Sequence, residues 1–268
     1  MKKLLRQTKV IATIGPATES EEMLEAIIKE GVDVCRINMA HADHNWVKEI
    51  SAKIRSVGKK LNREPAIMMD VKGPEIRTGY LQEEIQLKEN DPLDIIFKAQ
   101  PVPPISDGVW QIEVNYDKLA SHLKQGDTIL LDNGLIRLLV IESSPKKVRC
   151  NVSQDCTLKS RRHVNLPGIE TDLPSLTEKD RRDSLVGIEC GHDYFALSFT
   201  RDGDSIDLFR HFLRENGSEA QIIAKLEDQQ GVSNINEIIS ASDAIMIARG
   251  DLGIECAFED LPVIQRKT

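Results

Sequence analysis

The spacing of hydrophobic residues changes twice along this chain and divides it into three stretches. In the first stretch, up to residue 74, short apolar runs rich in β-branched residues alternate with longer amphipathic segments. The short runs are typical of buried strands and the longer segments of helices. The expected strands and helices follow one another over short connections, a pattern that predicts parallel βα units. The expected strands span 9–14, 32–38 and 66–71, and the expected helices span 21–30 and 45–61.

The middle stretch, residues 75–165, has the shorter period of half-buried strands. Short alternating segments are separated by turn residues, and Asn133-Gly134 is a strong hairpin-turn pair. We expect an inserted all-β domain here.

In the third stretch, residues 166–268, alternation of strands and helices resumes. Thr177 is placed to cap a helix that begins at the next residue. Further strands are expected at 193–199, 220–226 and 243–248, and further helices at 205–216 and 231–240.

Together, the first and third stretches contain six expected parallel strands. They predict a (β/α)8 TIM-type barrel that is incomplete, formed by 1–74 and 166–268, with the β domain of 75–165 inserted as a lid. An open doubly wound sheet would need an early phosphate-binding glycine loop. Neither G-x-G-x-x-G nor G-x-x-x-x-G-K-[ST] occurs in the chain.

Polar and charged residues close four of the expected strands. Residues two apart on a strand point to the same face, and the active site of a barrel lies at the carboxyl ends of its strands. One such pair alone is equally well explained as a solvated strand end, but four on one rim favour a functional site. Two acids beside a lysine suit a divalent cation and a phosphate. The residues are Arg36 and Asn38, Asp70 and Lys72, Lys225 and Glu227, and Arg249 and Asp251.

Composition and charge exclude several classes of protein. The net charge of −8 argues against nonspecific nucleic-acid binding. No apolar run reaches the length of a membrane helix, and the basic start, residues 1–6, lacks the apolar core of a secretory leader. The five cysteines have no zinc-type spacing and suit reduced thiols. We therefore expect a cytoplasmic protein that binds neither nucleic acid nor membrane.

Four segments resemble, in order, the motifs of the pyruvate kinase family. They are TKVIATIGPA at 8–17, MDVKGPEIRTG at 69–79, KLED at 225–228 and MIARGDLG at 246–253. The similarity runs through essentially the whole chain. It implies a barrel with a β lid and a C-terminal α/β domain, of which this chain would carry only the N-terminal part, without the last two barrel strands.

The resemblance implies phosphoryl transfer from phosphoenolpyruvate to ADP, which yields pyruvate and ATP in the last step of glycolysis. Lys225 would neutralise the transferring group, and Arg36 would contact it. Glu227 and Asp251 would bind Mg²⁺ or Mn²⁺. The backbone around Gly250 and Asp251 would receive the substrate carboxylate.

Other positions are expected near the ligands on the same ground. Ser198 matches a position near the substrate, although a capping serine is equally plausible. The nucleotide would lie near four residues, of which His41 and Lys179 also suit ordinary surface roles. These four are Pro16, His41, Arg77 and Lys179.

The chain departs from the family pattern at the monovalent-cation site. Asn38, Asp70 and the carbonyl of Val71 resemble ligands for K⁺. Ala40 stands where the family has a serine, so one hydroxyl ligand is missing. We expect a weakened K⁺ site.

Three hypotheses follow. The first is a pyruvate kinase fragment with little activity alone, because the proton-relay threonine of the family would lie beyond Thr268, and with a homo-oligomeric state at full length. The second is a non-catalytic paralogue that acts through a partner chain. The third is a metal-dependent aldolase or lyase that acts on pyruvate. The lid disfavours the third.

Overall fold

The computed structural model describes residues 7–97, 105–106 and 108–268. The chain forms two compact units. The first unit contains the described residues up to Pro74, Pro174–Leu226 and Asn234–Ile247. The second unit contains Glu75–Leu173, Glu227–Ser233 and Ala248–Thr268. The domain boundaries expected from the sequence stay a prediction.

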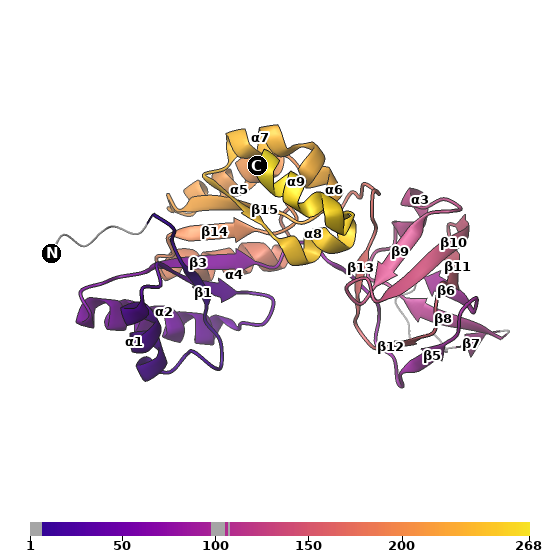
Figure 1. The fold of residues 1–268 in the computed structure, drawn as a ribbon, viewed down its shortest axis with the longest axis horizontal. Helices are drawn as coiled ribbons and strands as arrows, with labels where there is room; N and C mark the ends of the chain where they lie inside the picture. Colours follow the sequence, from indigo (N-terminus) through magenta and orange to yellow (C-terminus); the bar gives the residue numbers. More distant parts are fainter. Residues whose placement is uncertain (1–6, 98–104, 107) are drawn as a thin grey trace. The chain divides into compact units, whose positions relative to one another are not determined.

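The first unit is built on a six-stranded parallel sheet with the order β1-β2-β3-β14-β15-β16. Its strands are β1 (Ile11–Thr13), β2 (Val34–Asn38), β3 (Ala66–Val71), β14 (Tyr194–Leu197), β15 (Gln221–Leu226) and β16 (Ala244–Ile247). Its helices are α1 (Glu21–Glu30), α2 (His44–Lys60), α4 (Glu178–Glu189), α5 (Gly203–Glu215) and α7 (Ile235–Ala241). In Figure 1, α1 lies beside α2, and α5 lies beside α7.

The two faces of this sheet bury different residues, because successive side chains on a strand point to opposite sides. One face packs against the helices, with Met69 and Phe195 fully buried in the larger core. The other face carries a much smaller cluster of Met68, Ala196 and Ile223. A large core outside and a small one inside is the arrangement of a barrel wall.

The edge strands of this sheet, β1 and β16, each pair with one neighbour among the described strands. Ile11 on β1 keeps 48% of its surface exposed. The sheet is therefore open. It confirms the expected incomplete (β/α)8 barrel with an all-β insertion.

Polar side chains and a glycine cap the helix ends in this unit, and the cap expected at Thr177 is among them. The Ser20 side chain accepts the backbone N–H of Met23, and Gly31 takes the left-handed conformation at the end of α1. Thr177 and Asp180 form a capping box at the start of α4. The single helix expected at 231–240 is wrong, since the structure has α6 (Gln229–Ser233) and α7 with a break at Asn234.

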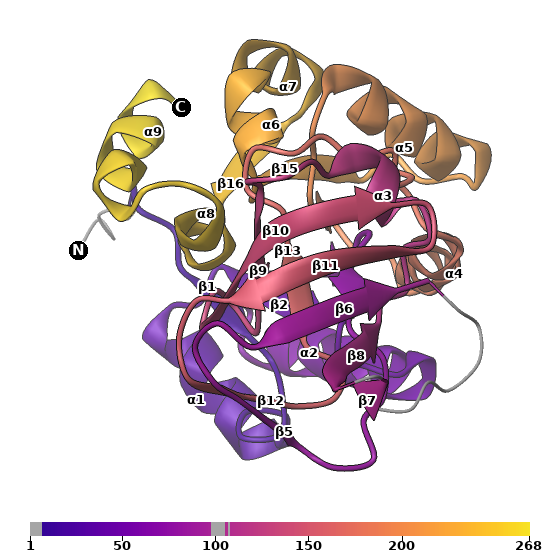
Figure 2. The ribbon, with the colours of Figure 1, turned by 90° about the vertical axis from the view of Figure 1, so that its right-hand side faces the viewer.

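The second unit contains an eight-stranded sheet with the order β4-β13-β9-β10-β11-β6-β8-β7 and a two-stranded sheet, β12-β5. Figure 2 shows β10, β11 and β6 side by side. The larger sheet is formed by β4 (Ile76–Arg77), β6 (Pro92–Ile96), β7 (Ile105–Ser106), β8 (Val109–Glu113), β9 (Thr128–Leu131), β10 (Ile136–Ser144), β11 (Lys147–Val152) and β13 (His163–Asn165). The smaller one is formed by β5 (Ile85–Leu87) and β12 (Cys156–Leu158), and the helices are α3 (Leu119–His122), α6, α8 (Arg249–Glu255), the 3₁₀ helix η1 (Phe258–Asp260) and α9 (Leu261–Lys267).

The expected turn at Asn133-Gly134 joins β9 to β10. Asp132, Asn133 and Gly134 all have positive φ. Asn, Asp and Gly tolerate this conformation best, which explains why the chain reverses there.

The five cysteines are free thiols, as expected. Burial raises the pKa of Cys35 to about 11 and that of Cys150 to about 12. Neither is a reactive thiolate at neutral pH. None of the helices in the described part of the chain is long and apolar enough to cross a membrane.

Candidate active site

Asp70 is the centre of a hydrogen-bonded network at the carboxyl ends of the parallel strands. Arg36, near the end of β2, donates its Nε to Asp70 Oδ2 at 2.7 Å. Lys225, near the end of β15, donates its Nζ to Asp70 Oδ1 at 3.0 Å. One carboxylate on β3 therefore joins cations from two other strands of the sheet.

Ser198 completes this network; it directly follows β14, the strand between β3 and β15. Its Oγ donates to the carbonyl of Val71 at 2.7 Å and accepts from Lys225 Nζ at 2.8 Å. On the other side, Arg36 Nη1 donates to Thr13 Oγ1 at 2.8 Å. The name "rim cluster" below means Thr13, Arg36, Asp70, Ser198 and Lys225.

Strand register explains why these residues meet. In the sheet, Asp70 pairs with Asn38 on β2 and with Ala196 on β14. Because the strands are parallel, residues at their carboxyl ends lie along one edge of the sheet. The first unit therefore brings Arg36, Asp70 and Lys225 together, whereas Glu227, Arg249 and Asp251 of the expected rim belong to the second unit.

Gly73 holds the chain close to this cluster just after β3. Its φ is +71°, and a Cβ at this position would lie 2.9 Å from Ser198 Cβ and 3.0 Å from the Ser198 carbonyl oxygen. Its backbone N–H donates to Asp180 Oδ1 at 3.0 Å. Glycine is required here both for its conformation and for the close approach of the backbone.

The charges of the rim cluster are largely withdrawn from water. Asp70 is 2% exposed and Lys225 is 8% exposed, whereas the Arg36 side chain keeps 25% of its surface accessible. Two cations therefore share one carboxylate. A cation in a poorly solvated place interacts strongly with an anion, and a phosphoryl group is a suitable one.

The two acids expected to bind a divalent cation belong to the second unit. Glu227, which follows β15, is 2% exposed. Asp251 lies in the first turn of α8 and is partly buried. Across the described residues, no group of three or more His, Cys, Asp or Glu side chains is arranged to hold a metal. Two carboxylates fit Mg²⁺, which usually takes one or two from a protein and completes its shell with water and substrate phosphate.

The oxygens expected to bind a monovalent cation all accept hydrogen bonds from the protein. Asn38 Oδ1 accepts the backbone N–H of Ala40 at 3.0 Å. The Val71 carbonyl accepts from Ser198 at 2.7 Å, and both oxygens of Asp70 face cationic side chains.

Among the residues expected near a nucleotide, Lys179 contacts two other residues of the first unit. Its Nζ donates to the carbonyl of Met39 at 3.0 Å and to Asp183. His41 and Pro16 are exposed.

Arg77, the fourth residue expected near a nucleotide, lies in the second unit. Its Nε pairs with Glu75 at 2.8 Å, and its Nη1 donates to the carbonyl of Arg161 at 3.0 Å. These contacts are with protein groups. The roles of the residues expected from the sequence, from Arg36 to Asp251, stay predictions.

The sequence did not single out several residues that surround the expected ones. Thr13 ends β1 opposite Arg36, and its position at a strand end was the available signal. Buried Asp183 accepts from Lys179 and lies 2.8 Å from His44 Nε2. No spacing in the sequence links His44 with Asp183, because they come from α2 and α4.

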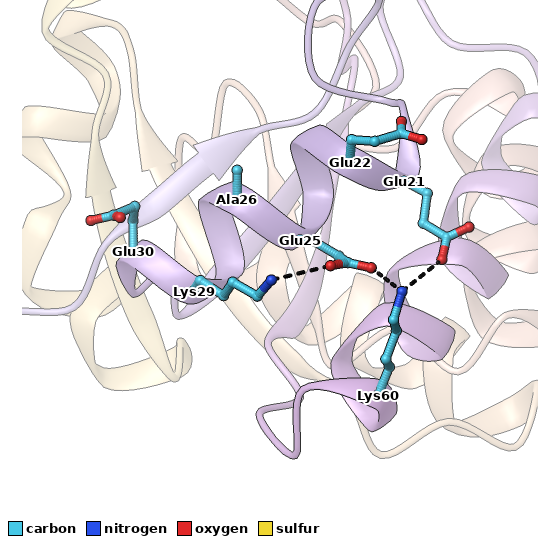
Figure 3. A pocket seen from close by; sticks show the side chains of 7 residues that line it. All are labelled: Glu21, Glu22, Glu25, Ala26, Lys29, Glu30 and Lys60. Atoms are coloured by element: carbon cyan, nitrogen blue, oxygen red, sulfur yellow. Dashed lines mark hydrogen bonds and ion pairs between the residues drawn. The ribbon is translucent and has the colours of Figure 1, made fainter.

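A surface hollow on the first unit shares no residue with the rim cluster. Figure 3 shows that its charged side chains largely pair with one another, with Lys60 contacting Glu21 and Glu25, and Lys29 contacting Glu25. It is a solvated charged surface. Its lining residues are Glu21, Glu22, Glu25, Ala26, Lys29, Glu30 and Lys60.

Comparison with known proteins gives a consistent result. Residues 5–268 match the model of the pyruvate kinase barrel domain. A pyruvate kinase from Staphylococcus haemolyticus is 38% identical over 265 residues, which are 98% of this chain and 44% of that protein. A pyruvate kinase from Staphylococcus aureus has the same identity and coverage. The chain therefore spans less than half the length of these curated relatives.

The fold is similar as well. A crystal structure of a pyruvate kinase from Cryptosporidium parvum superposes with a TM-score of 0.92 at 34% sequence identity. The alignment covers 98% of this chain and 54% of that one.

Proposed function

The chain belongs to the pyruvate kinase family, and we propose that it forms the phosphoryl-transfer site of an enzyme that converts phosphoenolpyruvate and ADP into pyruvate and ATP. The observation that carries this proposal is the buried meeting of Arg36 and Lys225 on Asp70. Phosphoryl transfer depends mainly on positioning and on stabilising negative charge. Two cations held in place by one carboxylate can supply both.

Lys225 has the main role in this mechanism. It is 8% exposed, and Asp70 and Ser198 orient its Nζ. The Lys225 ammonium group is therefore already oriented before the substrate arrives. Little reorganisation is then needed as charge develops on the transferring group. Arg36 is more exposed and would approach the same group from the side of β2.

Glu227 and Asp251 would hold Mg²⁺ or Mn²⁺. When bound, such an ion polarises phosphoryl and enolate oxygens as a Lewis acid. The backbone at Gly250 and Asp251 would receive the substrate carboxylate. Ser198 would also contact the substrate. Pro16, His41, Arg77 and Lys179 would lie near the nucleotide.

We further propose that K⁺ binds weakly. Ala40 offers no hydroxyl, and the oxygens of Asn38, Asp70 and Val71 already accept hydrogen bonds. A bound K⁺ would share these oxygens with their protein donors. A cytoplasmic location and a homo-oligomeric state for the full-length protein remain predictions.

The test is pyruvate formation from phosphoenolpyruvate and ADP with Mg²⁺, measured for this chain and for a chain extended to the length of its relatives. In whichever form is active, Lys225→Met should lower kcat by a factor of about 10³, because a charge aimed at the transition state is lost.

Lys147→Met is the matched control. Lys147 also pairs with a buried aspartate, Asp94, at 2.8 Å, but it lies on β11 in the second unit. It should change kcat by less than about threefold, since it serves no reacting group. Retained turnover in Lys225→Met would contradict the proposal. Folded wild-type forms that bind Mg²⁺ but give no turnover would favour the non-catalytic paralogue.

A further inference from the structure

The segments that carry the two expected magnesium ligands are tied together at Glu255. Glu227 stands two residues before Gln229, the first residue of α6. Asp251 stands one helical turn before Glu255 on α8. The Gln229 side chain donates its Nε2 to the backbone carbonyl of Glu255. One hydrogen bond therefore joins the segment of one expected ligand to the helix of the other.

Asn165, which lies in a third segment, also forms a hydrogen bond with Glu255. At the end of β13, its Nδ2 donates to Glu255 Oε1 at 2.9 Å. Asn165 is 3% exposed and Glu255 is 8% exposed, so the bond is shielded from water. A hydrogen bond to a carboxylate in such a place holds its partners in one geometry.

Helix α8 needs such support to hold a fixed position. It spans Arg249–Glu255, and Ala248 before it provides no side-chain cap. A helix of this length has little stability of its own. Its buried residue Leu252 and the contacts of Glu255 therefore set where Asp251 lies.

Asn165 is also a poor choice for stability alone. Its Oδ1 is buried without a hydrogen-bond partner among the described residues. An unsatisfied buried oxygen of this kind costs about 1–3 kcal/mol. Asn165 therefore leaves its Oδ1 unpaired while its Nδ2 binds Glu255. This combination indicates that the bond to Glu255 serves a purpose other than stability.

We propose that Asn165, Gln229 and Glu255 form a positioning strut that sets the separation of Glu227 and Asp251 and so the affinity for the divalent cation. The inference rests on the proposed function, which assigns the metal to those two acids. Residues that orient metal ligands without touching the metal typically change its affinity 10–100-fold when they are replaced.

The experiment measures Mn²⁺ binding to the 268-residue chain by the loss of the free-ion electron paramagnetic resonance signal. Gln229→Met keeps the length of the side chain and removes the donor. It should raise the Kd for Mn²⁺ by about 10-fold or more. Hydrogen exchange at the Cys256 N–H, which donates to the Leu252 carbonyl at 2.8 Å, should become faster in the same variant.

Gln154→Met is the matched control, since Gln154 Nε2 donates to the backbone carbonyl of Leu135 at 3.2 Å elsewhere in the second unit. It should leave the Kd unchanged. Glu255→Gln keeps an oxygen that Asn165 can donate to and should stay within about threefold of the wild type. A loss of binding in Glu255→Gln would instead make Glu255 a direct ligand and overturn the strut.

The outcomes separate the two proposals. If the wild-type chain binds Mn²⁺, and Glu227→Gln and Asp251→Asn abolish binding while folded Gln229→Met binds as tightly as the wild type, the strut is wrong and the metal site stands. If the wild-type chain binds no Mn²⁺, or Glu227→Gln and Asp251→Asn leave binding unchanged, the metal assignment fails and the strut falls with it. Should Gln229→Met not fold, Asn165→Leu replaces it under the same criteria.

Discussion

Each unit of this protein buries one aspartate between an arginine and a lysine. In the first unit, Asp70 faces Arg36 and Lys225. In the second, Asp94 faces Arg149 at 2.6 Å and Lys147 at 2.8 Å. The two carboxylates are almost equally buried, at 2% and 1% exposure. The same three groups, however, are assembled in different ways.

The cations around Asp94 come from one strand. Lys147 and Arg149 lie two residues apart on β11, and Arg149 is the cross-strand neighbour of Asp94. Their side chains remain 39% and 34% exposed. Burial alone would raise the pKa of Asp94, but hydrogen bonds from Arg149 and Lys147 outweigh it and hold that pKa below its ordinary value. This is a local pairing that stabilises a sheet.

The cations around Asp70 come from two strands, and the Lys225 side chain is only 10% exposed. Bringing a lysine into such a place costs desolvation that a local pair avoids. The difference shows that the composition of a charged cluster does not reveal its role. The two clusters differ in the origin of their cations and in the exposure of the lysine.

The largest expected effect tests this difference directly. Asp70→Asn removes the carboxylate shared by Arg36 and the buried Lys225 and should lower the free energy of unfolding of the first unit by about 3–5 kcal/mol. Asp94→Asn should lower that of the second unit by about 1 kcal/mol, because its partners can turn into solvent.

Urea unfolding of single-tryptophan variants measures both effects. Trp46 packs on the core of the first unit and Trp110 on that of the second, so the fluorescence of each reports its own unit. Equal losses in the two variants would remove the distinction drawn above.

A smaller effect should appear on acidification. Burial, with the charge of Arg55, lowers the pKa of His192 to about 4. The unfolded chain therefore binds more protons than the folded chain between pH 6.5 and 4. The contribution of His192 to the stability of the first unit is complete above this range and falls by about 3 kcal/mol across it.

In the second unit, hydrogen bonds from Lys118 and Tyr116 lower the pKa of Asp172 to about 2. The contribution of Asp172 to stability therefore persists down to pH 3.8 and is lost below that pH.

The two tryptophans sharpen this contrast. From pH 6.5 to 4, the urea midpoint of the Trp46 transition should fall. His192→Gln should reduce the slope of that midpoint against pH. The contribution of Asp172 predicts no shift of the Trp110 transition over the same range. A slope that is unchanged by His192→Gln would count against the role of His192.

The smallest effect compares two glycines with positive φ. Gly126→Ala, at φ +93° with nothing within 4 Å of the new Cβ, should cost about 1 kcal/mol from backbone strain. Gly73→Ala, at φ +71°, carries the same strain and also meets the backbone of Ser198. We expect about 2–3 kcal/mol for it in the Trp46 transition. Equal losses of stability in the two variants would show that Ser198 moves away from the new Cβ at no cost in free energy.

The sequence predicted the elements of the first unit well, because hydrophobic spacing and helix caps depend on residues that are close together in the sequence. The strand expected at 66–71 is β3 as observed. The helix expected at 231–240 was wrong for a nonlocal reason. Asn234 donates its Nδ2 to the carbonyl of Arg201 at 2.9 Å, and the helix breaks there.

For the site, the sequence predicted which strand ends carry charge but not how the charges pair. Asp70 and Lys225 are 155 positions apart, and Asn165 and Glu255 are 90 apart. Strand register and helix placement decide such contacts, and neither is visible in local spacing. The family motifs supplied the roles, whereas the structure added that Asp70 contacts both cations.

The sharing of Asp70 has a consequence for any anion that reaches Arg36 and Lys225. Such an anion would compete with the aspartate for hydrogen bonds that it already receives, so part of the attraction would be offset. After the anion leaves, the same aspartate would again be the partner of both cations. Neither cation would then be left without a carboxylate, so an anion that is strongly attracted need not stay for long.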